Sequence, residues 1–313
     1  MDRFLITGGA GFIGSNIADR LLEKGHFVRV MDNFFSGKRE NLDKASAFGS
    51  FELVEGDIRD VDAVRAACRG IDFVLHEAAI PSVPRSMDDP LTSNDVNING
   101  TLNVLVASRD SGIKRVVYAA SSSAYGDTPL LPKREDMPPS PLSPYAVSKL
   151  AGEYYCRVFS GAYGLETVCL RYFNIFGPRQ DPLSTYAAVI PRFISAMLRG
   201  ESPMVNGDGE QSRDFTYVEN VVQANINACY SGGVSGMLFN VACGERFTLN
   251  DLIRQLEEIT KKKANQRYLP PKKGDVRHSH ADIARAREYI DYRVAVDFRE
   301  GLRKTVAYFA EAR

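Results

Sequence analysis

Several features are scarce or absent in this 313-residue chain, and each absence excludes a class of protein. The five cysteines are odd in number and widely scattered, without the close spacing of a zinc or redox site. We therefore expect free, mostly buried thiols in a reducing compartment and no metal centre. Neither sign of charge is in excess, since Lys plus Arg and Asp plus Glu both number 39, which disfavours nucleic acid or a charged membrane surface as a partner.

Long apolar stretches and a targeting segment are also missing. No apolar run approaches the roughly 18 residues that a membrane-spanning helix needs. A strand pattern already begins at residue 3 with the letters RFLIT, which leaves no room for a leader before it. The sequence therefore predicts a cytoplasmic protein that does not enter a membrane.

Residues 1–172 alternate short apolar runs with helical patterns. The runs are apolar on both faces and rich in Val, Ile, Leu and Phe, which is typical of buried parallel strands. Their alternation with helices predicts the α/β class, with a doubly wound parallel sheet of the Rossmann type. The expected strands are residues 3–7, 27–31, 51–55, 72–76, 115–120 and 166–172.

The pattern loosens after residue 172, where Pro and Gly become frequent. We interpret residues 173–313 as a smaller substrate-binding lobe, with a return to the first domain near residues 213–242. The stretch LPPKKGDVRHS at 269–279 is too charged and too rich in Pro and Gly for a core, and predicts a surface loop that faces a ligand. The helices expected in this part are residues 186–199, 218–231, 248–260 and 298–311.

A glycine pattern follows the first expected strand. Gly8, Gly11 and Gly14 lie between that strand and a helix starting near Phe12, where a tight turn and close approach to a pyrophosphate require glycine. The amino end of that helix offers unpaired N–H groups to phosphates. Asp32 ends the second strand, where a carboxylate can bind the adenosine ribose and favours NAD over NADP. Alternatively, Asp32 is an ordinary turn residue.

Asp57 and His76 lie at the ends of two further expected strands, near the expected cofactor. Asp57 closes the third strand beside the adenine position, or else caps the helix that follows it. We interpret His76 as a structural histidine. The small residues that follow it, which include Ala78 and Ala79, let a flat dinucleotide pass close to the backbone.

The stretch SPYAVSK indicates chemistry at the other end of the cofactor. Ser143 and Pro144 are favourable first residues of a helix, which places Tyr145 in the first turn and Lys149 one turn further on. A nearby ammonium lowers the pKa of a phenol, and Ser121 at the end of the fifth strand could share the proton. Without the glycine pattern, the same residues could merely pack and solvate a helix face.

Taken together, Gly8-x-x-Gly11-x-x-Gly14, Ser121 and Tyr145-x-x-x-Lys149 resemble the extended short-chain dehydrogenase/reductase family. RYFNIFGPRQ at 171–180 and SRDFTYVENV at 212–221 are similar to its nucleotide-sugar branch. SVPRS, AAVIP and GDVRHS are similar to the NAD-dependent UDP-sugar 4-epimerases, in particular the UDP-N-acetylglucosamine 4-epimerase subgroup.

The resemblance implies a site in which Ser121, Tyr145 and Lys149 are catalytic and NAD is the tightly bound cofactor. It also implies that Arg213 and Arg277 clamp a diphosphate, although both could instead form surface salt bridges. The implied cofactor-binding residues are Gly8, Gly11, Phe12, Ile13, Gly14, Asp32, Asn33, Asp57, Ile58, Ala78, Ala79, Asn97, Tyr145 and Lys149. The implied substrate-binding residues are Ser82, Ser122, Tyr145, Asn174, Gln180, Ala188, Val189, Arg213, Arg277 and Ser279.

Four positions bear on which reaction and which sugar the resemblance implies. Dehydratases of the family carry an Asp-Glu pair where this chain has Ser122 and Ser123, which disfavours elimination of water. By resemblance, Ser279 faces the sugar C2 substituent and leaves room for an N-acetyl group, although it could be an ordinary loop serine. Pro81 departs from the family pattern by stiffening the loop that would line the sugar pocket.

We therefore expect a small-molecule UDP-sugar substrate that is epimerised at C4, with UDP-GlcNAc and UDP-GalNAc favoured and UDP-Glc and UDP-Gal possible. The alternatives are a UDP-glucuronate 4-epimerase, another NAD-dependent dehydratase or decarboxylase, and a catalytically idle NAD-binding sensor. By resemblance, the helices near 93–111 and 144–163 pair with a second copy to form a homodimer.

Overall fold

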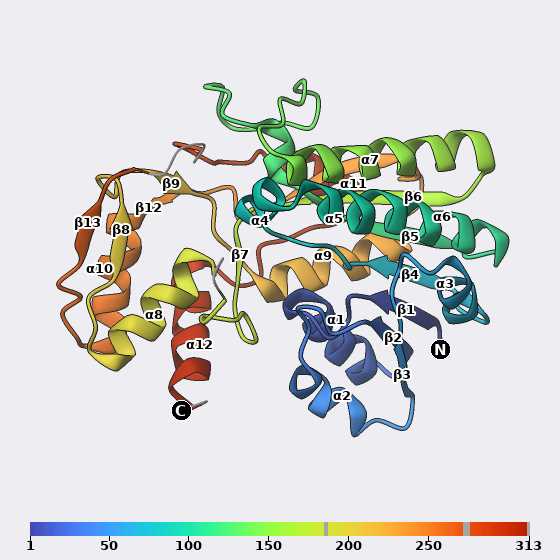
Figure 1. Cartoon of the computed structure of the whole chain (residues 1–313), viewed down its shortest axis with the longest axis horizontal. Coiled ribbons are helices and arrows are strands. Elements are labelled where there is room, and N and C mark those ends of the chain that lie inside the picture. The colour runs from blue at the N-terminus through green and yellow to red at the C-terminus, as the bar shows by residue number, and fades with distance from the viewer. Residues whose placement is uncertain (185–186, 272–275, 312–313) are drawn as a thin grey trace.

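The computed structural model describes residues 1–184, 187–271 and 276–311. A seven-stranded sheet crosses its centre in the order β11-β6-β5-β4-β1-β2-β3, and every neighbouring pair is parallel (Figure 1). This confirms the predicted fold class. The strands are β1 (Arg3–Thr7), β2 (Phe27–Asp32), β3 (Phe51–Glu55), β4 (Phe73–His76), β5 (Arg115–Ser121), β6 (Glu166–Tyr172) and β11 (Met237–Val241).

Helices cover both faces of the sheet, because successive strand side chains point to opposite sides. On β1, Phe4 and Ile6 join the core beneath α1 (Phe12–Glu23) and α9 (Val218–Tyr230). Leu5 joins the separate core on the other face, which is covered by α3 (Val61–Cys68), α6 (Gly100–Asp110) and α7 (Pro144–Tyr163) (Figure 1). Burial on both faces explains why these strands lack polar alternation.

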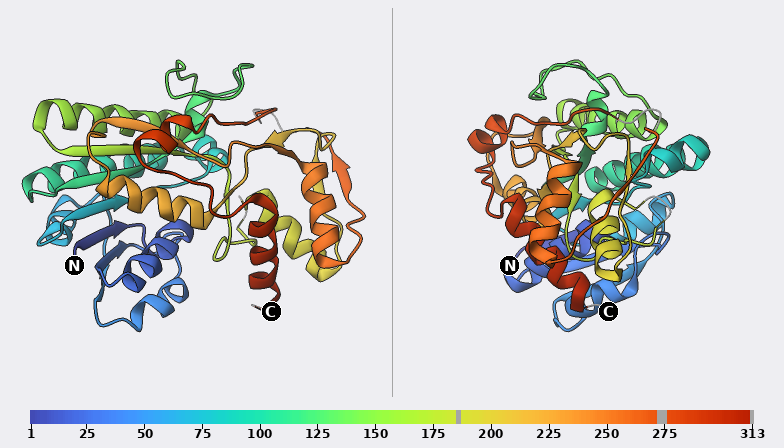
Figure 2. Two further views of the ribbon diagram at one scale, coloured as in Figure 1. Left: turned by 180° about the vertical axis from the view of Figure 1, so that it is seen from behind. Right: turned by 90° about the vertical axis from the view of Figure 1, so that its left-hand side faces the viewer.

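The second lobe lies beside the sheet and is built mainly from helices, as the left view of Figure 2 shows. Helices α8, α10 and α12 pack on one another, and two short two-stranded sheets complete the lobe. The sequence did not predict these sheets, since strands of two or three residues show no periodicity. The helices of this lobe are α8 (Val189–Arg199), α10 (Leu249–Thr260) and α12 (Phe298–Glu311). One sheet pairs β8 (Met204–Asn206) with β13 (Arg267–Leu269), and the other pairs β9 (Ser212–Arg213) with β12 (Phe247–Thr248).

The chain returns to the sheet between the parts of the second lobe. Within residues 213–242, β10 (Thr216–Tyr217) pairs with β7 (Ile175–Phe176), α9 covers the sheet, and β11 pairs with β6. The remaining short elements are the 3₁₀ turns at Arg39–Leu42 and Ser122–Tyr125, α2 (Asp43–Ser46), α4 (Val83–Asp88), α5 (Pro90–Asn94), a π-helical turn at Asp95–Asn99, and α11 (Ala284–Tyr289).

Several smaller expectations can be compared with the structure. All five cysteines are buried and free, and His76 is a buried residue hydrogen-bonded to Thr7 and Thr101, as predicted. Burial lowers the pKa of His76 to about 3, so the ring is neutral. Residues 272–275 of the expected 269–279 loop and the expected helix start at 186 lie outside the described residues. Among the described residues, no helix is both long and apolar enough to cross a bilayer.

Candidate active site

A cavity of about 650 Å³ lies along the carboxyl ends of the central strands. Its lining comes from the segments that follow β1, β2, β4, β5 and β6, and from loops of the second lobe. In open α/β sheets this edge is where ligands bind, because the loops leaving parallel strands converge there. The volume lies in the range typical of small-molecule sites.

The glycines after β1 form a cradle of bare backbone. Gly8 has φ of +69°, and a Cβ placed there would lie 2.7 Å from the backbone of Ala78. A Cβ on Gly14 would lie 2.5 Å from the carbonyl oxygen of Gly8. Gly11 begins α1 without any side-chain cap, and Gly11, Phe12 and Ile13 line the cavity. The unpaired N–H groups at this helix end therefore face the cavity, where they fit a pyrophosphate.

Asp32 lies both at the turn after β2 and on the cavity wall. Its carboxylate lines the cavity and accepts hydrogen bonds from the backbone N–H of Ala10 at 2.9 Å and of Phe34 at 2.8 Å. Burial raises the pKa of Asp32, and these two bonds oppose that rise. The residue thus holds the turn after β2, and its contact with a ribose stays a prediction.

Asp57 lies on the cavity wall and does not cap the following helix. It accepts hydrogen bonds from Arg59 and, at 2.8 Å, from the side chain of Asn33, which also lines the cavity. The Arg59 bond is the main reason why the pKa of Asp57 falls to about 2. The cap of α3 is Asp60, which accepts two backbone N–H groups of the first turn, so the capping interpretation of Asp57 was wrong.

The segment after β4 completes the cofactor half. Ala78, Ala79 and the buried Ile58 line the cavity, whereas Asn97 lies behind it. Asn97 accepts the backbone N–H of Ile80 at 2.8 Å and donates to the Ser148 hydroxyl at 3.0 Å. Asn97 therefore shapes the main chain of the cofactor wall from outside.

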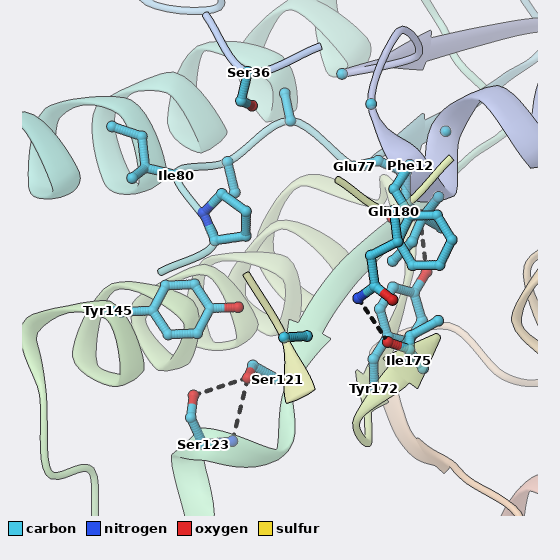
Figure 3. A pocket seen from close by; sticks show the side chains of 18 of the residues that line it. Phe12, Ser36, Glu77, Ile80, Ser121, Ser123, Tyr145, Tyr172, Ile175 and Gln180 are labelled. Atoms are coloured by element: carbon cyan, nitrogen blue, oxygen red, sulfur yellow. Dashed lines mark hydrogen bonds between the residues drawn. The ribbon is translucent and has the colours of Figure 1, made fainter. Parts of the chain in front are cut away.

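Tyr145 reaches the cavity because α7 begins where the sequence predicted. Ser143 caps the helix by accepting the N–H of Ala146 at 3.2 Å, and Pro144 is the first helical residue. The ring of Tyr145 points its hydroxyl toward Ser121 (Figure 3), which accepts from the N–H of Ser123 at 3.2 Å and from its hydroxyl at 2.8 Å.

The electrostatics of this group differ from the expectation. Burial raises the pKa of Tyr145, and a hydrogen bond with Ser121 partly offsets that rise. The Lys149 ammonium donates instead to the carbonyl oxygen of Ala119 at 2.8 Å. Burial lowers the pKa of Lys149 to about 8, and Glu77 opposes this. Burial therefore outweighs the lowering of the Tyr145 pKa that the sequence predicted.

Seven of the ten expected substrate residues line the cavity. Ser82 does not line it and instead caps α4 by accepting the N–H of Arg85 at 3.1 Å. Val189 does not line it either, since it begins α8. The residues that line it are Ser122, Tyr145, Asn174, Gln180, Ala188, Arg213 and Ser279.

The two arginines expected to clamp a diphosphate occupy different environments. Arg213 lines the cavity and donates to the carbonyl oxygens of Ser212 at 3.0 Å and of Arg277 at 3.2 Å. The guanidinium of Arg277 is more than half exposed and pairs with Asp208 at 2.9 Å. A clamp by both arginines stays a prediction, and it requires Arg277 to leave Asp208.

Sequence reasoning missed two charged residues of the cavity wall. Glu77 lines it directly after β4, and its carboxylate accepts the hydroxyl of Tyr172 at 2.8 Å. Lys133 lines it from the loop before α7, and its buried ammonium donates to the Thr128 carbonyl and hydroxyl oxygens. Neither belongs to a motif; only the position of Glu77, one residue past a strand end, was a usable signal.

A fold with a dinucleotide cradle that opens onto a partly buried tyrosine defines the class of nucleotide-dependent α/β enzymes. Within that class, residues 4–242 match the NAD dependent epimerase/dehydratase family, and the chain belongs to this family. The resemblance found in the sequence is thereby confirmed. The chain is an enzyme that uses NAD, and its cradle and Asp32 fit that cofactor.

Known relatives match along nearly the whole chain. The chain is 39% identical over 309 residues to a UDP-glucose 4-epimerase of Mycolicibacterium smegmatis, covering 98% of each chain. It superposes with a TM-score of 0.95 and 41% identity on a UDP-N-acetylglucosamine 4-epimerase of Methanobrevibacter ruminantium in complex with UDP-N-acetylmuramic acid, covering 100% of this chain and 99% of that one. For the Thermus thermophilus UDP-glucose 4-epimerase complex with NAD, the TM-score is 0.91 at 36% identity, covering 99% and 100%.

Proposed function

We propose that this chain is an isomerase that inverts C4 of a UDP-hexose, with UDP-N-acetylglucosamine and UDP-N-acetylgalactosamine as its favoured pair. The observation that carries this proposal is the arrangement of the cavity. The Tyr145 hydroxyl meets Ser121 beside the dinucleotide cradle, while Arg213 and Ser279 lie in the half that faces the second lobe. One cavity thus offers a proton acceptor, a cofactor site and an anion site.

Each of four residues has a separate role in the proposed epimerisation. Ser121 orients the 4-hydroxyl of the sugar, and Tyr145 accepts its proton and later returns it. NAD, when bound, supplies a reversible hydride acceptor for C4. Arg213 holds the diphosphate, so that the oxidised sugar can turn about its linkage and present its opposite face. Ser122 adds a hydroxyl contact to the sugar.

The raised pKa of Tyr145 sets a requirement for this chemistry. A phenol that holds its proton is a poor base, so positive charge must be added when the ligands bind. The nicotinamide ring carries that charge in the oxidised cofactor. Lys149, whose pKa is lowered to about 8, adds a second cation when it is protonated.

The preference for an N-acetylated sugar rests on Ser279. Its backbone N–H donates to the carbonyl oxygen of Ser212 at 2.9 Å, which fixes the loop against β9, and its small side chain lines the cavity. A small side chain leaves volume for an N-acetyl group, whereas a bulky one would fill it. The Methanobrevibacter ruminantium neighbour holds an N-acetylated UDP-sugar, which supports the same preference.

A UDP-glucuronate is the second candidate substrate, and one observation favours it. Lys133 places a buried ammonium on the cavity wall, where it could pair with a sugar carboxylate. Burial lowers the pKa of Lys133, and a carboxylate partner would raise it again. A UDP-glucuronate 4-epimerase of Thermodesulfobacterium geofontis, 33% identical over 321 residues and covering 99% of this chain and 97% of the relative, is consistent with this candidate.

The test is a side-by-side rate comparison of the purified protein with UDP-GlcNAc, UDP-Glc and UDP-GlcA. We expect the 4-epimer of UDP-GlcNAc to form fastest by NMR, without net production of NADH. A faster rate with UDP-GlcA would select the second candidate. No product from any of the three, or accumulation of a 4-keto product, would refute the proposal.

We also propose that two copies associate through the helices at one side of the sheet. On α7, Val147, Tyr154 and Val158 are each about half exposed, and they lie on one face because they are separated by seven and four residues. Leu91 on α5, which packs beside α7, is 83% exposed. An apolar stripe of this kind is typical of an interface, since water solvates it poorly.

A further inference from the structure

Glu77 is a carboxylate at the reacting end of the cavity that the proposed chemistry leaves unused. Its partner Tyr172 lies directly opposite Ser121 in the register of β6 and β5, so Glu77 lies near the acid/base pair. Figure 3 shows Glu77 and Tyr172 on the same side of the cavity as Phe12 of α1. The position is therefore beside the amino end of α1, where the cradle for the cofactor lies.

The hydrogen bonds around Glu77 favour its ionised form. Asn225 donates its side-chain N–H to the hydroxyl oxygen of Tyr172 at 2.7 Å. The Tyr172 proton is thereby directed to Glu77, which accepts it at 2.8 Å. A carboxylate that accepts a hydrogen bond from a fixed donor is stabilised as the anion.

No cation of the described residues lies close enough to neutralise this anion. Glu77 forms no ion pair within 4.0 Å anywhere in residues 1–184, 187–271 and 276–311. Lys149 acts on it only over a longer distance, since the Lys149 ammonium is bonded to Ala119. A partly buried carboxylate without a cationic partner is costly, unless a ligand supplies the positive charge.

We propose that Glu77 is the counter-ion of the oxidised nicotinamide ring, and that its carboxylate stabilises bound oxidised NAD over bound NADH. The oxidised ring carries a positive charge that is lost on reduction, so a nearby anion favours the oxidised form. The inference rests on NAD as the cofactor and is independent of which sugar is turned over. Glu77 acts on the charge of the bound cofactor and transfers no proton, whereas Tyr145 and Ser121 carry the proton chemistry.

The charge of Glu77 depends on pH. Burial raises its pKa to about 7, while the bond from Tyr172 and the charge of Lys149 oppose the rise. Tyr172 stays protonated because burial holds its pKa well above the usual value, and burial raises the pKa of Tyr145 on α7 and of Cys229 on α9 as well. Lys149 is thus the facing group that also titrates near neutral pH. The stabilisation by Glu77 is present above its pKa and is lost as the pH falls through it.

The test measures the midpoint potential of the bound cofactor in the holoenzyme, by equilibration with a redox mediator and the absorbance of bound NADH. The variant Glu77→Gln keeps an acceptor for Tyr172 and removes the charge. At about pH 8.5 we expect its potential to lie about 30 mV above that of the unmodified protein, which is a tenfold loss of preference for oxidised NAD. The difference should shrink as the pH falls below the pKa of the carboxyl group.

Two controls separate charge from shape. Glu77→Asp keeps the charge and should keep the lower potential, even if Glu77→Gln folds poorly. Glu135→Gln removes a partly buried carboxylate whose oxygen accepts the N–H of Asn240 at 2.8 Å, outside the cavity lining, and should leave the potential unchanged. Equal potentials for Glu77→Gln and the unmodified protein above pH 7, or a difference that does not vary with pH, would overturn the proposal.

Discussion

Tyr145 illustrates how single residues in this cavity depend on their surroundings. Burial raises its pKa, while the hydroxyl of Ser121 is close enough to share its proton. The ammonium of Lys149, one helical turn away, is bonded to the main chain of β5. The phenol is therefore protonated until ligands bring positive charge into the cavity.

Replacement of Tyr145 by Phe should remove the proton acceptor and leave the cofactor site intact. We expect epimerisation to slow by about 10³-fold, which is the usual contribution of a well-placed acid/base group. The measurement is the initial rate of 4-epimer formation, together with the NAD content of the purified variant. Unchanged activity would favour an idle NAD-binding sensor over an enzyme of this mechanism.

Ser279 is the residue at which we expect the sugar to be selected. Ser279→Tyr should fill the space next to the sugar C2 position, and lower kcat/KM for UDP-GlcNAc at least about tenfold more than for UDP-Glc. The measurement is a pair of kcat/KM values for each protein. Ser82→Thr, outside the cavity lining, serves as the matched control and should change neither value. Equal losses on both sugars would contradict a role for Ser279 in selection.

At the scale of elements, a buried ion pair joins α7 to the sheet. Arg171 of β6 and Glu153 of α7 form two hydrogen bonds, at 2.8 and 2.6 Å, and both side chains are buried. The pair lies one helical turn beyond Lys149. It fixes the helix that carries Tyr145 to the strand that leads to Tyr172.

Glu153→Ala should leave the guanidinium of Arg171 buried without its partner. We expect the free energy of unfolding to fall by about 3–5 kcal/mol, because an uncompensated buried charge is costly. Denaturant unfolding measures this change. The exposed pair of Arg299 with Glu258, at 2.7 Å, provides the control, and Glu258→Ala should cost less than about 1 kcal/mol. A similar small cost for both variants would contradict the assigned role.

The elements could be predicted from the sequence wherever one physical signal dominated. Buried strands such as Arg3–Thr7 and Glu166–Tyr172 are apolar on both faces, and the Ser143-Pro144 start fixed the beginning of α7. The sequence could not show that Asp60, three residues beyond Asp57, is the cap of α3, because both aspartates precede the helix.

The site was harder to predict where its residues depend on tertiary contacts. Glu77 acquires its role only when β6 brings Tyr172 beside it, 95 residues further along the chain. The outward direction of Arg277 depends on Asp208, which likewise lies in another segment. Motifs show which residues can do chemistry, whereas long-range contacts decide which of them face the cavity.

At the scale of the whole molecule, the apolar stripe on α7 predicts a homodimer. A double variant, Val147→Glu with Tyr154→Lys, places charges on that stripe and should give a monomer, because burying unpaired charges at an interface is costly. Light scattering measures the mass. Met204→Lys, on an exposed apolar residue of the second lobe, should leave the dimer intact. A monomeric mass for the unmodified protein would refute the prediction.

The path of the chain between the lobes limits how this enzyme can be altered. After β6 the chain enters the second lobe with α8, returns for α9 and β11, leaves again for α10 and β13, and passes α11 beside β11 before it ends in α12 (Figure 1). The sugar-binding part is therefore not one continuous piece of sequence. It cannot be exchanged as a cassette by joining two fragments of homologous genes, so new specificity has to come from substitutions in place, at positions such as Ser279.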